Sequence, residues 1–398
     1  PASPPAGLAS CGRRYSRYGI LPESLERRIA AAGGGEGGRE FRPPDVILVG
    51  TGMTYWYPGA VEAVRLCRKV FPGVPVLAGG IYASLMPDHC SRATGADAVI
   101  AGDGGRGLAE NLPRFGLPAP EGPFPAAPLP LPGVWKDAAV LRLNEGCPLS
   151  CDYCASRLLT PHFIAGDPAA AADLVRDFTA RGIRNFAFYD DALLAGREKV
   201  FLPFLERVAG FRGGGTDPRF YLPNAVHIRG LDRVTAELMH RAGFREIRMG
   251  FESSSPDFHA AHTPGGAKFS PDSFPETVRI LEEAGFSRKS LSVYILAGLP
   301  GQRAEETEIS VRAALRERVT VRLSEYSPVP GTGLWEESVR LSRHPVAEEP
   351  LFHNNSFFPM EWEGFTRGDL QRLKNLARTG GDTPGGGGYL DQPVGEPL

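Results

Sequence analysis

The stretch that decides the fold is residues 144–155, with the sequence Asn-Glu-Gly-Cys-Pro-Leu-Ser-Cys-Asp-Tyr-Cys-Ala. It places Cys147, Cys151 and Cys154 on one short loop with the spacing C-x3-C-x2-C, and Tyr153 precedes the last cysteine. Three thiolates on a tight loop can bind three irons of a cubane cluster, which normally has four cysteine ligands. Because no fourth cysteine is nearby, we expect one iron to stay open for another ligand, as in catalytic metal sites.

Two other interpretations of the three cysteines remain open. They could be half of a zinc site, since zinc favours four Cys or His ligands. The nearest histidine, His162, is eight residues past Cys154, which is not a usual zinc spacing. They could also be thiols that only pack in the core. Single scattered cysteines are most often small buried hydrophobes, and this is the interpretation of Cys11, Cys67 and Cys90.

Length and composition limit the classes of function. The chain has 398 residues, enough for two domains, and a formal net charge of -2. This charge gives no electrostatic case for nucleic acid or an anionic membrane as a partner. No apolar run approaches the ~20 residues that span a bilayer, and no signal peptide is visible at the start. Six cysteines are too few for a disulfide scaffold, so we expect a reduced, cytoplasmic location.

Residues 138–337 alternate between short apolar segments and segments with helical periodicity. Six such repeats predict a partial (β/α)6 TIM-type barrel, in which the chemistry gathers at the carboxyl ends of the strands. The polar and glycine-rich motifs of this region all follow predicted strands. The predicted strands are 138–143, 183–189, 220–225, 245–251, 291–297 and 319–324, and the predicted helices are 167–181, 197–211, 231–242, 273–284 and 303–316.

The cysteine loop and the order of the strand-end motifs resemble the radical S-adenosylmethionine (SAM) superfamily. The resemblance implies a [4Fe–4S] cluster on Cys147, Cys151 and Cys154, whose open iron chelates the amino and carboxylate groups of SAM. It implies reductive cleavage of SAM to a 5′-deoxyadenosyl radical, with an electron donor such as flavodoxin or ferredoxin. It also implies SAM contacts from Tyr153, Asp190, Asp191, Arg248, Glu252, Gly298 and Pro300.

The predicted SAM contacts depart from the superfamily pattern in two places. Asp190 and Asp191 stand where Gly-Gly-Glu is usual, and Gln302 follows the Gly-Leu-Pro-Gly motif where an acid is common. One of the two aspartates could instead cap the following helix. Arg248 could point to the surface, although Arg248 and Glu252 are an even number apart and should share a strand face.

The amino-terminal half contains a smaller alternating unit at residues 43–116. Predicted strands at 45–50, 74–80 and 97–102, with a helix at 59–71, indicate a Rossmann-like parallel sheet. Ligands of such sheets bind beyond the carboxyl ends of the strands. Glycines follow each strand there, and they could admit a bulky ligand or simply form tight turns.

The motifs of this smaller unit resemble cobalamin-binding domains fused ahead of radical SAM domains. The resemblance rests on 14–20 (Arg-Tyr-Ser-Arg-Tyr-Gly-Ile), 53–59 (Met-Thr-Tyr-Trp-Tyr-Pro-Gly) and 79–83 (Gly-Gly-Ile-Tyr-Ala). The usual D-x-H-x-x-G motif is absent, and nothing before Asp45 supplies the usual first strand and helix. We therefore expect a truncated sheet, His89 at the surface and cobalamin without a histidine ligand. The implied cobalamin contacts are Thr51, Met53, Thr54, Tyr55, Gly79, Gly80, Tyr82 and Gly102.

These interpretations give an expected organisation and function. The segments are a linker or partial region at 1–42, the cobalamin-binding-like domain at 43–116, a Pro-rich linker at 117–137, the barrel at 138–337, an extension at 338–379 and a disordered tail at 380–398. The expected activity is methylation or rearrangement of an unidentified small molecule or peptide. Alternatives are a methylthiotransferase, which would need three further cysteine ligands, a ring-forming cyclase, and a non-catalytic cobalamin or iron–sulfur sensor.

Overall fold

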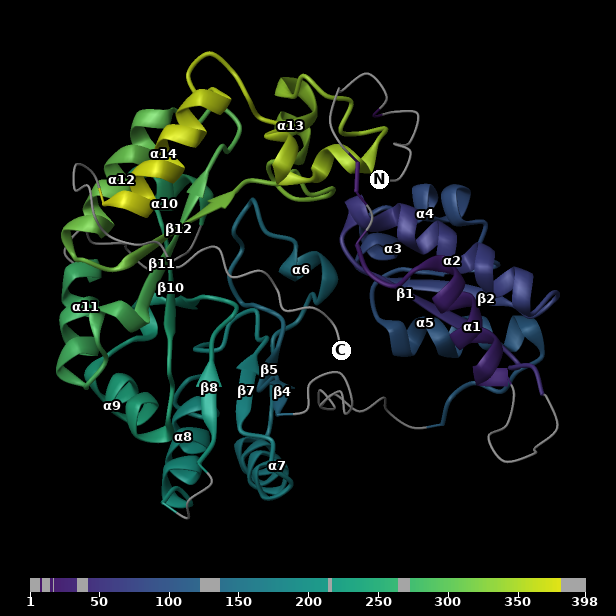
Figure 1. The fold of residues 1–398 in the computed structure, drawn as a ribbon, viewed down its shortest axis with the longest axis horizontal. Coiled ribbons are helices and arrows are strands. Elements are labelled where there is room, and N and C mark those ends of the chain that lie inside the picture. Colours follow the sequence, from purple (N-terminus) through teal and green to yellow (C-terminus); the bar gives the residue numbers. More distant parts are fainter. Residues whose placement is uncertain are drawn as a thin grey trace. The chain divides into compact units, whose positions relative to one another are not determined.

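The computed structural model describes residues 8, 15–16, 18–33, 42–121, 137–213, 217–263 and 273–380. It is a mixed α/β protein with parallel sheets, and it divides into two compact units (Figure 1). Unit 1 comprises Pro1–Phe124, Leu158–Thr160 and Ser327–Pro359, and unit 2 comprises the remaining segments. The predicted extension at 338–379 is therefore divided between the units, because residues up to Pro359 belong to unit 1 and the rest belongs to unit 2. Most of the predicted linkers and the tail lie outside the described residues.

Unit 1 is built on a parallel sheet with the strand order β1-β2-β3. Apolar residues of helix α2, including Val64 and Cys67, pack with Val76 on one face. Leu77 and Ile100 pack with Leu108 of α5 on the other face. The strands are β1 (Ile47–Thr51), β2 (Val76–Gly80) and β3 (Ala98–Ile100), and the helices of this unit are α1 (Pro22–Gly33), α2 (Tyr57–Val70), α3 (Ile81–Leu85), α4 (Pro87–Thr94) and α5 (Gly104–Asn111).

The segment Ser327–Pro359 completes unit 1 and includes helix α13 (Trp335–Leu341). Phe352 and Phe357 are buried there, with ring centroids 5.2 Å apart. The Nδ1 atom of His353 lies 2.7 Å from the Oγ1 atom of Thr54, which follows β1. This segment therefore supports the turn at the carboxyl end of the first strand.

Unit 2 contains two parallel sheets with the orders β4-β7-β8 and β12-β11-β10-β9. A strand overlaps each predicted strand, but the third, 220–225, overlaps only β8, which pairs with β7. A further short strand, β9, follows the predicted range and pairs with β10. Residues 219–227 therefore connect the two sheets through one stretch of chain. The strands are β4 (Ala138–Leu141), β7 (Asn185–Phe188), β8 (Arg219–Tyr221), β9 (Val226–His227), β10 (Ile247–Glu252), β11 (Leu291–Ala297) and β12 (Thr320–Glu325), and an antiparallel pair is formed by β5 (Asn144–Glu145) and β6 (Ile164–Ala165).

Helices of unit 2 lie along the outer side of the strands, as α11, α12 and α14 do beside β10–β12 in Figure 1. Alternate strand residues such as Met249 and Phe251 are buried in the core, which also contains a stack of Phe188 on Phe244 with centroids 5.6 Å apart. The opposite strand face carries the polar residues. The helices are α6 (Ser156–Leu159), α7 (Pro168–Ala180), α8 (Phe201–Gly210), α9 (Arg233–Ala242), α10 (Pro256–His262), α11 (Ser273–Glu283), α12 (Ala304–Arg316) and α14 (Arg367–Thr379).

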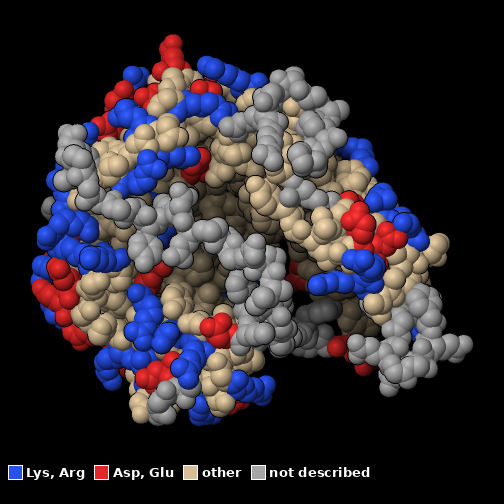
Figure 2. Space-filling model, viewed as in Figure 1, with Lys and Arg blue, Asp and Glu red and all other residues tan. Residues whose placement is uncertain are grey.

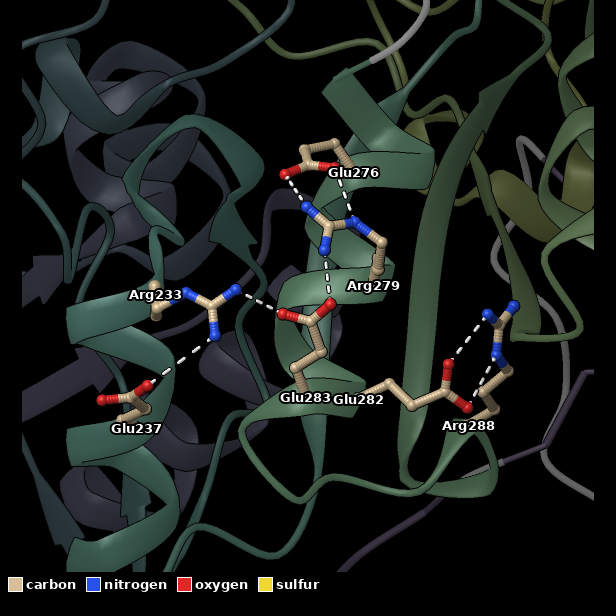
Figure 3. Close-up of polar contacts among 7 residues, drawn as sticks. All are labelled: Arg233, Glu237, Glu276, Arg279, Glu282, Glu283 and Arg288. Carbon is tan, nitrogen blue, oxygen red and sulfur yellow. Dashed lines mark hydrogen bonds and ion pairs between the residues drawn. The ribbon is translucent and has the colours of Figure 1, made fainter.

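The outer helices carry mixed charges rather than a patch of one sign. Figure 2 shows Lys and Arg interspersed with Asp and Glu on the visible face. Arg233 of α9 pairs with Glu283 of α11, and Arg279 bridges Glu276 and Glu283 within α11 (Figure 3). Such exposed ion pairs add little to stability. Among the described residues, no helix has the length and apolar character needed to cross a membrane.

Candidate functional site

The cysteine loop follows β4 and the short β5–β6 pair. Cys147 and Cys151 are half-buried and Cys154 is exposed. Burial raises the pKa values of the Cys147 and Cys151 thiols, and each of these thiols also interacts electrostatically with Cys154. The three sulfurs therefore form one group at the carboxyl end of the first strand of unit 2.

The donor set fits a cluster whose irons are held by separate cysteines. Among the described residues, no three His, Cys, Asp or Glu side chains converge closely enough to hold a single metal ion. Cluster ligands bind different irons and need not meet at one point. The loop thus offers three neighbouring thiols, with Cys154 open to solvent.

Asp190, a predicted SAM contact, anchors the start of the cysteine loop. It is 3% exposed, and its carboxylate accepts hydrogen bonds from the backbone N–H groups of Leu143 (3.0 Å) and Asn144 (2.7 Å). Burial raises the pKa of Asp190 to about 6, although these two amides act in the opposite direction. The carboxylate is therefore engaged with the backbone, and it does not cap a helix.

Asp191 and Tyr153 face the cysteine sulfurs more directly. Asp191 acts electrostatically on Cys147 and hydrogen-bonds with Ser156. Burial raises the pKa of Asp191, while Ser156 lowers it. Tyr153 hydrogen-bonds through its hydroxyl to Cys151. Of the two predicted aspartates, Asp191 is the one whose carboxylate stays available beside the cluster loop.

The end of α10 also holds the cysteine loop, which the sequence analysis did not anticipate. The Asp152 carboxylate lies 3.1 Å from Nδ1 of His262, and the Asp152 N–H donates to the His262 carbonyl at 3.1 Å. The hydroxyl of Thr263 lies 3.5 Å from the Cys151 sulfur. His262 and Thr263 lie at the end of α10 that is farther from the preceding strand, so no strand-end pattern in the sequence marks them. These contacts fix the middle of the loop from a second element.

Arg248 is committed to neighbouring side chains. Its Nε donates to Glu246 at 2.9 Å, and its Nη1 donates to the Tyr294 hydroxyl at 3.3 Å. Arg322 also donates to Glu246, at 3.2 Å. The predicted contact of Arg248 with a SAM carboxylate therefore requires exchange of an existing ion pair.

Glu252 closes β10 in an irregular conformation. Gly250 pairs with Tyr294 and Glu252 pairs with Ile295, so Phe251 is the extra residue of a bulge. Glu252 has φ 60°, in the left-handed region that non-glycine residues rarely adopt. Arg248, Gly250 and Glu252 share the less buried side of the strand, as their spacing predicts.

The Glu252 carboxyl group faces the cysteine loop. It acts electrostatically on both Tyr153 and Cys151. The residue keeps some exposure, but its carboxyl group is enclosed, and burial raises the pKa of Glu252 to about 7. The structure thus brings this predicted residue to the predicted site.

The Gly-Leu-Pro-Gly motif follows β11 and is fixed by Gln302. The side-chain oxygen of Gln302 accepts from the N–H groups of Gly298 (2.7 Å) and Leu299 (3.1 Å). Gly298 has φ 83°, a conformation that favours glycine. Gln302 therefore shapes this turn from within, and Pro300 stays partly exposed beside it.

Unit 1 has a separate cavity of about 200 Å³ at the carboxyl ends of its strands. Its lining includes three of the residues predicted to contact cobalamin, Thr51, Met53 and Tyr82. The lining residues that the sequence analysis missed are Val49, Gly50, Gly52, Trp56, Tyr57, Gly59, Ala60 and Ala63.

Two other predicted cobalamin residues, Gly79 and Gly80, lie next to Thr51 of the cavity lining. Gly80 has φ 100°, and a Cβ atom there would lie 2.4 Å from the Thr51 carbonyl oxygen. The Thr51 hydroxyl in turn donates to the Gly79 carbonyl at 2.7 Å. The Thr54 hydroxyl is hydrogen-bonded to the His353 ring. Neither Tyr55 nor Gly102 lines the cavity.

His89 is not the free surface residue that the sequence suggested. Its Nδ1 lies 2.5 Å from the Tyr82 hydroxyl, and its ring meets the Tyr57 ring edge to face at 5.0 Å. Burial lowers the pKa of His89. The expectation failed because a histidine beside Pro-Asp in sequence gave no sign of the tyrosines that pack on it.

Comparison with known proteins agrees with this arrangement. Residues 141–314 match the family described as the radical SAM superfamily. The chain carries a radical SAM domain. Enzymes with this domain use a [4Fe–4S] cluster and SAM, and the three cysteines lie within the matched residues. A search of curated proteins found no match.

Solved structures resemble more of the chain than the radical SAM domain alone. The methyltransferase TsrM from Kitasatospora setae, with cobalamin and a [4Fe–4S] cluster bound, aligns over 81% of this chain and 68% of its own, with 17% identity and a TM-score of 0.62. TsrM with tryptophan and a SAM analogue aligns over 89% and 79%, with 17% identity and a TM-score of 0.65. The cobalamin-dependent enzyme OxsB aligns over 84% and 50%, with 11% identity and a TM-score of 0.55. At these identities the likeness concerns the fold.

Proposed function

We propose that this protein is a cobalamin-dependent radical SAM enzyme that methylates or rearranges a small molecule or peptide. In this proposal the strands of unit 2 form an open (β/α)6 barrel, and unit 1 is a Rossmann-like cobalamin-binding domain. The observation that carries it is the cysteine loop, which Asp190 anchors and which Asp191, Tyr153 and Glu252 face.

Each residue around the loop has a role in this proposal. Cys147, Cys151 and Cys154 would hold the cluster, and Asp191 would accept a hydrogen bond from the ammonium group of SAM. The turn at Gly298 would admit the adenine next to the backbone. When bound, the cluster supplies the electron that cleaves SAM to methionine and a 5′-deoxyadenosyl radical, which takes a hydrogen atom from the substrate.

The case for cobalamin rests on unit 1. Its cavity lies at the carboxyl ends of β1 and β2, where parallel sheets bind ligands. Trp56 is 61% exposed at this edge, although it is a large aromatic residue. TsrM and OxsB, which share the fold, are described as cobalamin-bound and cobalamin-dependent. Methylcobalamin would supply the methyl group, and flavodoxin or ferredoxin would supply the electrons.

The methylthiotransferase alternative has less support from the structure. It would need further cysteine ligands in unit 1, but Cys67 is buried on α2 and Cys90 is buried on α4. Burial raises the pKa values of both thiols, which disfavours the thiolate that binds metal. Cys11 lies outside the described residues.

The test is anaerobic reconstitution with iron, sulfide and cobalamin, followed by incubation with SAM and a strong reductant. The proposal expects 5′-deoxyadenosine and a cobalamin spectrum without histidine ligation. The spectrum should be unchanged in His89→Ala, because His89 is bound to Tyr82. A protein that holds the cluster but never releases 5′-deoxyadenosine, even with candidate substrates, would be a sensor and not this enzyme.

A further inference from the structure

Arg229 is a half-buried arginine whose guanidinium is incompletely paired among the described residues. It lies in the 3-10 turn Ile228–Gly230, directly after β9, whose His227 is paired with Gly250 of β10. The Nε atom of Arg229 is buried and has no hydrogen-bond partner among the described residues. Since an unpaired buried donor costs about 1–3 kcal/mol, such an atom suggests a missing partner.

Among the residues that the structure describes, no carboxylate forms an ion pair with Arg229. Burial lowers the pKa of the Arg229 guanidinium, and the interaction that opposes this effect comes from Cys151. Arg229 also interacts with His227 and His259. Burial lowers the pKa of His227 to about 4 and lowers the pKa of His259, so both rings are neutral at pH 7. An anion that reaches Arg229 would therefore meet a guanidinium that no described carboxylate pairs with, although the Glu252 carboxyl group also faces Cys151.

Two other arginines of unit 2, Arg248 and Arg197, differ from Arg229 because each already pairs with a protein carboxylate. Arg248 donates to both carboxylate oxygens of Glu246, at 2.9 and 3.2 Å. Arg197 pairs with Asp232 at 2.9 Å. An anionic ligand would have to displace a protein carboxylate from either of them, whereas Arg229 needs no such exchange.

We infer that Arg229, and not Arg248, binds the carboxylate of SAM at the cysteine loop. The inference rests on the proposed function, because it needs SAM next to Cys151. A planar guanidinium suits a carboxylate, and its two parallel hydrogen bonds fix the orientation of the ligand. Arg229 is thus assigned as a positioning residue for SAM.

The test measures binding of SAM and of decarboxylated SAM to the anaerobically reconstituted full chain, by equilibrium dialysis. Arg229→Gln should weaken SAM binding roughly tenfold to a hundredfold, the range for a lost hydrogen bond to a charged group. It should leave the affinity for decarboxylated SAM unchanged. Arg229→Lys should restore part of the loss, and Arg248→Gln should leave both affinities unchanged. Iron content and circular dichroism of each variant confirm an intact cluster and fold.

Equal weakening of both ligands in Arg229→Gln would overturn the assignment, since the effect would then be unrelated to the carboxylate. Selective loss of SAM binding in Arg248→Gln, with Arg229→Gln unaffected, would also overturn it. Both outcomes leave the proposed function standing, because the wild type binds SAM in each. Failure of the reconstituted wild type to bind SAM would instead overturn the proposed function together with this assignment.

Discussion

Removal of the Asp190 carboxylate should loosen the start of the cysteine loop. Asp190→Ala leaves the buried N–H groups of Leu143 and Asn144 without an acceptor. At about 1–3 kcal/mol for each of the two unpaired groups, the free energy of unfolding should fall by about 2–6 kcal/mol. Asp190→Asn keeps one side-chain oxygen in place and should cost less than about 1 kcal/mol. The matched control is Asp173→Ala on the exposed face of α7, which should have little effect.

The same carboxylate should make stability depend on pH. Burial raises the pKa of Asp190 to about 6, from 3.8, so between these values the folded state keeps a proton that the unfolded state has lost. Its contribution to stability should therefore fall by about 3 kcal/mol as pH rises through this window. Urea unfolding from pH 4 to 7 measures both effects in wild type and Asp190→Asn. The reasoning is refuted if Asp190→Ala unfolds like wild type, or if Asp190→Asn keeps the full slope.

Three further outcomes follow from single contacts. Thr263→Val removes the hydroxyl 3.5 Å from the Cys151 sulfur, so the cluster's reduction potential should fall in spectroelectrochemical titration, and an unchanged potential would count against it. Gly80→Ala introduces a Cβ at φ 100°, 2.4 Å from the Thr51 carbonyl oxygen. The free energy of unfolding should fall by at least about 1–2 kcal/mol, as measured by thermal unfolding. The variant should also lose cobalamin binding, as measured by gel filtration. Burial lowers the pKa of His353 to about 4, from 6.5, so the protein should lose stability as pH falls from about 6.5 to 4. His353→Gln should abolish this loss of stability in unfolding measurements across the same pH range. An equal loss in the variant would contradict the role of His353.

The strands of both sheets could be predicted because their signal is local. The apolar run at 291–297 coincides with β11, and the alternating run at 183–189 contains β7. The early end of β8 at Tyr221 and the separate strand β9 at 226–227 could not be predicted, because the two strands pair with different neighbours. Residues 327–359 belong with unit 1 through contacts such as Thr54 to His353, which join positions far apart in sequence.

In the site, too, features set by neighbouring residues could be predicted from the sequence, and features set by distant contacts could not. The cysteine spacing and the glycine turn were predictable, since both depend on residues close together in the chain. The role of Asp190 was not, because its backbone partners, Leu143 and Asn144, lie 47 and 46 residues earlier in the chain. The ion pair of Arg248 with Glu246 was not predicted, and the unpaired Nε of Arg229 has no signature in the sequence.

The central claim is that Cys147, Cys151 and Cys154 hold one [4Fe–4S] cluster. The most direct measurement is iron per chain after anaerobic reconstitution, together with the absorbance near 400 nm, in wild type and in the triple Cys→Ala variant. The account predicts about four irons per wild-type chain and loss of both signals in the variant. Equal iron content in the two proteins would contradict it.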